Sequence, residues 1–124
     1  MTGGDREAYI REFAERRAAL LRIRQAKDAE REREAMARAR AVADLLKGRY
    51  GARAVLLYGS LAWGGFHEAS DIDLMVEGFQ GEFWPMYLEA ERLASPFELN
   101  LSWPRKPATR WPRRWRKEVF PYDA

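Results

Sequence analysis

Two short polar groups, separated by a loop-like stretch, are the residues in this chain best suited to chemistry. Gly59 and Ser60 follow an apolar run, and after ten further residues Asp71 and Asp73 flank one apolar side chain. If residues 70–76 form a strand, alternate side chains share a face, so both carboxylates point the same way. Carboxylates placed so close repel each other unless a positive charge lies between them. The pair therefore predicts a divalent cation site, and oxygen ligands of this kind suit Mg²⁺ with substrate phosphates.

The Gly59-Ser60 pair predicts the complementary part of such a site. A glycine after a buried strand allows backbone to come close to a ligand. If Ser60 opens a short helix, the unpaired N–H groups at the start of that helix and the serine hydroxyl would hold phosphates. The two groups together therefore predict a cation and a nucleotide bound side by side.

A third carboxylate would complete the cation site, and Glu98 is the candidate. Residues 97–103 alternate between apolar and polar side chains, which places Glu98, Asn100 and Ser102 on one face of a strand. If this strand lies beside residues 70–76, Glu98 can reach the same cation and act as metal ligand and general base. The alternative is that Glu98 faces solvent on an edge strand.

The elements that position these residues indicate an α/β fold. Residues 5–47 contain neither proline nor glycine and are rich in helix-forming side chains. They form either one long helix with a solvent-exposed polar middle at 25–34 or two helices with a break there. Strands are predicted over 52–58, 70–76 and 97–103, with a helix over 82–94. We expect a small mixed β-sheet of three or four strands, backed by helices on one face.

Three regions follow from this pattern: a helical extension at 1–34, a domain at 35–103 and a basic, aromatic tail at 104–124. The extension carries its own apolar stripe, so we expect it to contact another molecule, which includes a homo-oligomer. Tryptophans and arginines interleave in the tail, where one to two helical turns are expected over 111–120. We favour the interpretation that these tryptophans cover a hydrophobic core. The alternative is that the tail forms a nucleic-acid-binding surface.

Charge is unevenly distributed and cysteine is absent. Residues 51–102 carry eight acidic and two basic side chains, whereas residues 103–124 carry seven basic and two acidic ones. An acidic centre suits divalent cations, and a basic end suits phosphates or an acidic partner. Without cysteine, disulfides and thiolate sites are excluded. No run is long enough to span a bilayer and no signal-peptide pattern is present, so we expect a cytoplasmic protein without membrane contact.

The motif resembles that of the nucleotidyltransferase superfamily that includes DNA polymerase beta, and most closely its minimal nucleotidyltransferases. Their pattern is Gly-Ser, about ten residues, then Asp-x-Asp, and the chain reads GSLAWG at 59–64 and SDIDLMV at 70–76. The resemblance covers roughly residues 36–103. Two positions differ from the family: Glu98 stands where an aspartate is usual, and Trp63 where an arginine is common.

The resemblance implies a transferase that binds two Mg²⁺ ions and an NTP, with ATP expected. A hydroxyl would attack the α-phosphate, so that NMP, here AMP, is transferred. It implies nucleotide-binding roles for Gly59, Ser60, Gly64 and Ser70, and catalytic and metal-binding roles for Asp71, Asp73 and Glu98.

The resemblance also implies a partner. Many minimal members are encoded beside a helical ribonuclease toxin of the HEPN type, act as its antitoxin, and in some cases transfer AMP to one of its tyrosines. We therefore predict an enzyme of a toxin–antitoxin system. A non-catalytic antitoxin that occludes its partner is the main alternative, and a dimerisation protein built on the long helix is a weaker one.

Overall fold

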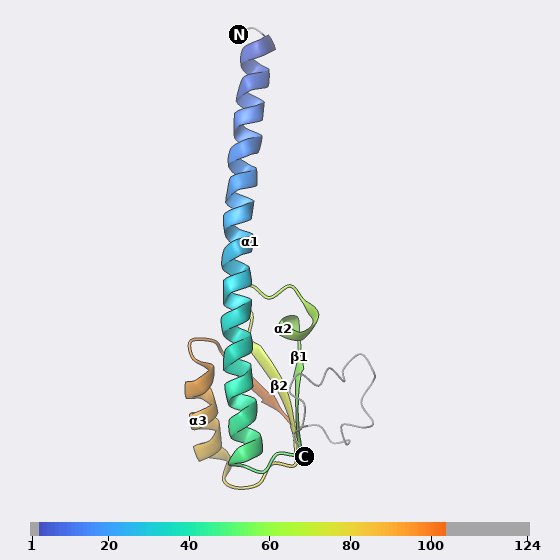
Figure 1. Cartoon of the computed structure of the whole chain (residues 1–124), viewed down its shortest axis with the longest axis vertical. Coiled ribbons are helices and arrows are strands. Elements are labelled where there is room, and N and C mark those ends of the chain that lie inside the picture. The colour runs from blue at the N-terminus through green and yellow to red at the C-terminus, as the bar shows by residue number, and fades with distance from the viewer. Residues whose placement is uncertain (1–2, 104–124) are drawn as a thin grey trace. The chain divides into compact units, whose positions relative to one another are not determined.

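The computed structural model describes residues 3–103 and combines helices with a small mixed sheet (Figure 1). The α/β class and the helices and strands predicted within residues 5–103 are confirmed. In chain order the elements are α1 (Gly3–Gly48), β1 (Ala54–Tyr58), α2 (Ser60–Trp63), β2 (Ile72–Glu77), α3 (Phe83–Ala94) and β3 (Leu99–Ser102).

Helix α1 is continuous, which decides between the two alternatives for the polar middle stretch. Its 46 residues run without a break, as expected where proline is absent and glycine occurs only at the ends. Side chains one turn apart pair along the exposed first half, with Arg16 Nη2 3.2 Å from Glu12 Oε1. Such i,i+4 pairs each add only about 0.3–0.5 kcal/mol, but they support the part of the helix whose side chains are all exposed.

Two compact units can be distinguished along the chain, Met1–Glu30 and Arg31–Ala124. In the first unit, every side chain described from residue 4 to 27 is exposed. The predicted apolar stripe is among them, at Tyr9, Ile10, Phe13, Leu20 and Leu21. Among the described residues, the buried core lies within residues 35–99.

The sheet is mixed, in the order β1-β2-β3. Strand β1 runs antiparallel to β2, with Tyr58 opposite Asp73. Strand β3 runs parallel to β2, with Asp73 opposite Asn100. The adjacency of β2 and β3, which sequence reasoning had to assume, is thus confirmed, and Asp73 lies in the middle strand between Tyr58 and Asn100.

Alternation along the strands divides the sheet into an apolar and a polar face. Leu57, Leu74 and Leu99 are buried on one face, where the second half of α1 and one side of α3 pack. Each helix supplies small or flexible side chains that allow close approach to the sheet. These are Ala39, Val42, Ala43 and Leu46 from α1, and Met86, Ala90 and Ala94 from α3. The opposite face carries Asp73 and Asn100, together with the buried Leu56.

A polar contact fixes the end of α1 to α3. The Tyr50 hydroxyl donates to Glu89 Oε2 at 2.6 Å, and Arg49 pairs with the other oxygen of that carboxylate. The hydrogen bond to Glu89 raises the pKa of Tyr50 above its ordinary value of 10.0. This contact holds α3 in register against α1, and α3 in turn forms one wall of the cavity described below.

Deletion of residues 1–30 should leave the remaining domain folded, because the core uses none of their side chains. We expect its free energy of unfolding in urea to change by less than about 1 kcal/mol. If the exposed stripe is an intermolecular contact, sedimentation should also show a smaller assembly after the deletion. A truncated protein that unfolds would contradict the first expectation, and a full-length monomer would contradict the second.

None of the helices within residues 3–103 has both the length and the apolar character needed to cross a membrane.

Candidate functional site

Asp71 and Asp73 converge on one side chain of the neighbouring strand. Asn100 Nδ2 donates to Asp71 Oδ2 at 3.2 Å and to Asp73 Oδ1 at 3.0 Å. Both carboxylates are partly exposed, so they remain accessible from solvent. The two carboxylates therefore lie on the same side, as predicted, although Asp71 stands directly before β2 and not within it. A single amide nitrogen, itself only partly positive, occupies the position between them where a cation would be strongly attracted.

The close contact between residue 59 and Asp73 requires a glycine at position 59. It has φ 77° and ψ −160°, a combination essentially restricted to glycine. A Cβ built at this position would overlap Asp73 Oδ2 and lie 3.2 Å from Asp73 Cγ. The missing side chain thus allows the turn after β1 to lie directly against the carboxylate. The Gly-Ser turn and the acid pair, distant in sequence, form one site.

Helix α2 begins at Ser60, as expected, but offers fewer free donors than predicted. The N–H groups of Ala62 and Trp63 both donate to the Gly59 carbonyl, at 3.1 and 3.0 Å. They are therefore already satisfied by the turn itself. Within this turn, the groups that would remain for the predicted phosphate contacts are the Ser60 hydroxyl and the N–H groups of Ser60 and Leu61.

Gly64 and Ser70 have structural roles in the loop that links the two parts of the site. The Gly64 N–H donates to the Ser60 carbonyl at 2.9 Å and closes α2, with φ 105° and open space where a Cβ would stand. Ser70 Oγ accepts a hydrogen bond from the His67 N–H at 3.0 Å, and the Ser70 N–H returns one to the His67 carbonyl. Their predicted contacts with a nucleotide stay predictions.

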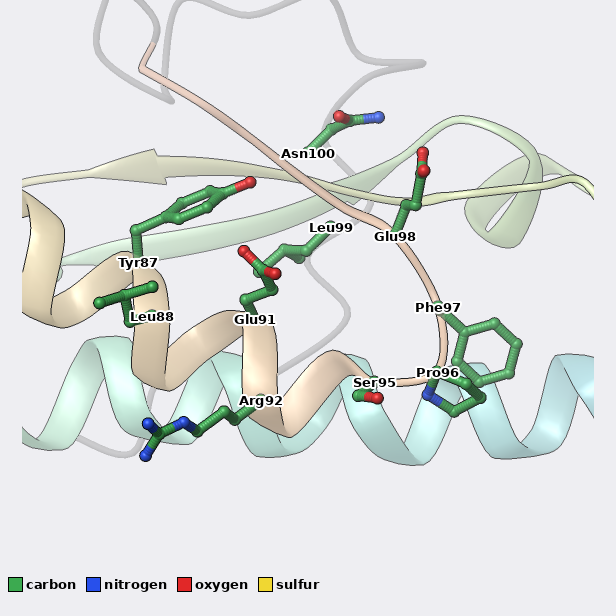
Figure 2. Close-up of a pocket in the computed structure, with 10 residues that line it drawn as sticks. All are labelled: Tyr87, Leu88, Glu91, Arg92, Ser95, Pro96, Phe97, Glu98, Leu99 and Asn100. Carbon is green, nitrogen blue, oxygen red and sulfur yellow. The ribbon is translucent and has the colours of Figure 1, made fainter.

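Glu98 lies on the expected strand edge but is not assembled with the aspartates. Its carbonyl accepts from the Ile72 N–H at 2.9 Å, which places it directly before β3 and beside the start of β2. Its side chain is exposed and projects to the same side of β3 as Asn100 (Figure 2). Within residues 3–103, no three acidic or histidine side chains are arranged to hold a metal. The role of Glu98 as third ligand and base stays a prediction.

A cavity of about 650 Å³ opens beside these residues, between α3 and β3 (Figure 2). Asn100, which bonds both aspartates, is one of its walls, and Glu98 is another. The remaining lining residues are Tyr87, Leu88, Glu91, Arg92, Ser95, Pro96, Phe97 and Leu99. Neither aspartate lines the cavity, and Asn100 is the residue that connects it to the carboxylate pair.

Asn100 is the site residue to which sequence reasoning assigned no role. Its type does not suggest catalysis, and only its spacing two residues after Glu98 placed it on the same face. The contact with both aspartates depends on the parallel pairing of β2 with β3, in which Asp73 stands opposite Asn100. Strand order cannot be read from spacing along the chain, so the role became apparent only from the tertiary structure.

The basic tail at 104–124, including the helical turns expected over 111–120, lies outside the described residues.

No family model matches the chain, and neither a curated protein nor a solved structure matches it.

Proposed function

We propose that the protein is a Mg²⁺-dependent nucleotidyltransferase that moves NMP, from ATP as the expected donor, to a hydroxyl group. The observation that carries this proposal is the arrangement of Asp71, Asp73 and Gly59. Two carboxylates meet at one amide nitrogen, and a glycine-only turn lies directly against one of them. A solvent-accessible carboxylate pair beside a tight Gly-Ser turn is the arrangement expected at a binding site for a divalent cation and its polyphosphate.

The donor set fits Mg²⁺. Asp71 and Asp73 provide carboxylate oxygens, and rotation of the Asn100 amide would turn its oxygen toward the same place. Mg²⁺ usually takes one or two protein carboxylates and completes its shell with phosphates and water. When bound, it would neutralise charge on the phosphates of the substrate.

The reaction that we propose forms one bond and breaks one. An acceptor hydroxyl oxygen bonds to the α-phosphorus, and the bond from that phosphorus to the bridging oxygen of the β-phosphate breaks, which releases pyrophosphate. The hydroxyl proton goes to a base, and Glu98 is the base we propose, because it faces the same side as Asn100 at the mouth of the cavity. Asp71 and Asp73 hold the donor in place.

The acceptor that we propose is a tyrosine hydroxyl of a HEPN-type toxin. This part rests on the resemblance of residues 59–64 and 70–76 to minimal nucleotidyltransferases. A protein acceptor supplies its own docking surface.

Calorimetric titration with ATP tests the donor site. Binding should require Mg²⁺, and it should weaken by at least about tenfold when Asp71→Asn and Asp73→Asn are combined. The control is Asp44→Asn, which makes the same chemical change at an exposed position of α1 away from the site. If the double variant binds Mg²⁺ and ATP as the natural protein does, the proposed site is wrong.

A second candidate function is a non-catalytic antitoxin that occludes its partner. The observation in its favour is the lack, within residues 3–103, of a third acid grouped with the aspartate pair. Asn100 stands against both aspartates instead, as a neutral donor. This candidate predicts a tight complex with the partner whose affinity is the same for the natural protein and the Asp71→Asn variant, and no transfer by either.

A further inference from the structure

Strand β3 has one free edge within the part of the chain that the structure describes. The sheet order is β1-β2-β3, so β3 pairs only with β2 there. The Glu98 carbonyl points to β2, where it accepts from Ile72. Backbone groups of successive residues in a strand point to opposite sides, so the N–H and carbonyl groups of Leu99 and Leu101 face away from β2. These groups form a template for one additional strand.

The cavity between α3 and β3 lies along this free edge (Figure 2). Tyr87 and Glu91 reach from α3 toward β3, and the backbone of Leu99 forms the opposite wall. An extended segment paired with β3 would direct alternate side chains into this space. The edge supplies backbone hydrogen bonds, and the cavity supplies room for side chains.

The charge of the cavity selects a basic occupant. Glu91 and Glu98 line it, and Asn100 connects it to Asp71 and Asp73. Arg92 also lines the cavity, but Figure 2 shows its side chain directed away from β3. The field along the β3 edge is therefore negative, which attracts lysine or arginine side chains and disfavours an anionic occupant such as RNA.

An exposed aromatic cluster extends the same surface. Phe83 lies 5.0 Å from Trp84 and 5.5 Å from Trp103 between ring centroids, and it stacks on Tyr87 at 5.8 Å. Trp84 is 68% exposed, and Tyr87 belongs to both the cluster and the cavity wall. Aromatic side chains that stay exposed in a group are characteristic of the energetic centre of protein–protein interfaces.

We propose that the free edge of β3, with its adjoining cavity and aromatic cluster, binds an extended basic segment of a partner protein as an added strand. The proposal rests on the proposed function in one respect only, namely that this segment would carry the acceptor hydroxyl to Glu98. The chain's own residues 104–124 are also basic, but Pro104 and Pro107 follow β3 closely and lack the N–H groups that strand pairing needs.

Fluorescence anisotropy with a labelled heptapeptide tests the proposal on the full chain without ATP. The probe alternates lysine and valine around a central tyrosine. We expect it to bind at low salt, and a version with glutamate in place of lysine to bind at least about tenfold more weakly. A version N-methylated at every backbone nitrogen retains the charge but has no N–H group to donate to β3, and it should lose binding to a similar extent.

Two variants locate the binding surface. Glu91→Lys reverses charge in the cavity and should weaken binding of the lysine peptide by about tenfold. Glu32→Lys makes the same change at an exposed position of α1 that does not line the cavity, and it should leave binding unchanged. Equal binding by Glu91→Lys and the natural protein, or equal binding of the N-methylated peptide, would overturn the proposal.

A third variant identifies the occupant. Arg113, Arg114 and Arg116 are reversed together to glutamate in the full chain, and peptide affinity should stay the same or rise less than twofold. A rise of tenfold would mean that the chain's own tail occupies the groove, which overturns a partner segment. The peptide assay contains no nucleotide, so it is independent of the donor site. If the natural protein binds Mg²⁺ and ATP but not the lysine peptide, this inference is wrong and the proposed function stands.

Discussion

Replacing Gly59 by alanine is expected to destabilise the protein by about 2–4 kcal/mol and to abolish Mg²⁺-dependent ATP binding. Gly59 has φ 77° and ψ −160°, a backbone conformation that residues with a Cβ rarely adopt. Strain of this kind costs about 1–3 kcal/mol of stability. The added methyl group would also overlap Asp73 Oδ2. Urea unfolding and calorimetry measure the two effects separately.

Gly64→Ala is the matched control for backbone strain. Gly64 has φ 105° and ψ 165°, which is equally unfavourable for alanine, but nothing lies within 4 Å of a Cβ built there. We therefore expect only the strain component, about 1–3 kcal/mol. The difference between the two alanine variants reports the contact between residue 59 and Asp73.

A double-mutant cycle isolates that contact. When Asp73 is first replaced by alanine, Gly59→Ala should lose about 1 kcal/mol less stability than it does beside Asp73, because the overlapping carboxylate is gone. Gly64→Ala should have the same effect in both backgrounds. If Gly59→Ala destabilises both backgrounds equally, the turn and the carboxylate are not in contact, and the site as described is wrong.

The second large effect is expected on activity, because Asp73→Asn should reduce NMP transfer by about a thousandfold or more. Loss of a metal-binding carboxylate removes several kcal/mol of transition-state stabilisation, and about 4 kcal/mol corresponds to a thousandfold in rate. The assay is the intact mass of the protein encoded beside this one after co-expression. A gain of one or more NMP units is expected with the natural chain and with Asp44→Asn, and no gain with Asp73→Asn.

The stability of Asp73→Asn should not fall with its activity. Asp71 and Asp73 meet at the same nitrogen of Asn100, so their charges repel each other when no cation is bound. An asparagine at position 73 removes that repulsion and still offers Asn100 an acceptor. We expect thermal unfolding at an unchanged or higher temperature, which separates a functional carboxylate from a structural one.

Other outcomes of the co-expression experiment are equally decisive. Equal mass gain with Asp73→Asn would remove Asp73 from the reaction. A tight complex without any mass gain would favour the occluding antitoxin. If no complex forms, a protein acceptor is wrong, and the free edge of β3 would lose the role of presenting the hydroxyl.

Much of the fold was predictable from local patterns. The absence of proline and glycine indicated α1, and alternation indicated the polar face of β3. These predictions succeeded because helix and strand periodicities are properties of neighbouring residues. The continuity of α1 through its polar middle was left open, because a stretch without a core face is compatible with one helix or two.

The availability of hydrogen-bond donors was predicted less well. Free N–H groups were expected along the first turn of α2, but the Gly59 carbonyl accepts from both Ala62 and Trp63. Gly59 is the N-cap of this short helix, and the carbonyl of an N-cap residue accepts the first hydrogen bonds of its helix. Because α2 has only four residues, these bonds occupy the N–H groups of its second half.

The residues suited to chemistry, and the side to which they point, followed from local spacing alone. Asp71 and Asp73 point the same way because the side-chain period of an extended chain is two. The groups that lie opposite them depend on contacts between strands that no local pattern contains. Parallel pairing of β2 with β3 brought Asn100 to both carboxylates, and the turn after β1 placed Gly59 against Asp73. Contacts between strands depend on sheet order and register, which the core selects through its packing across elements far apart in the chain.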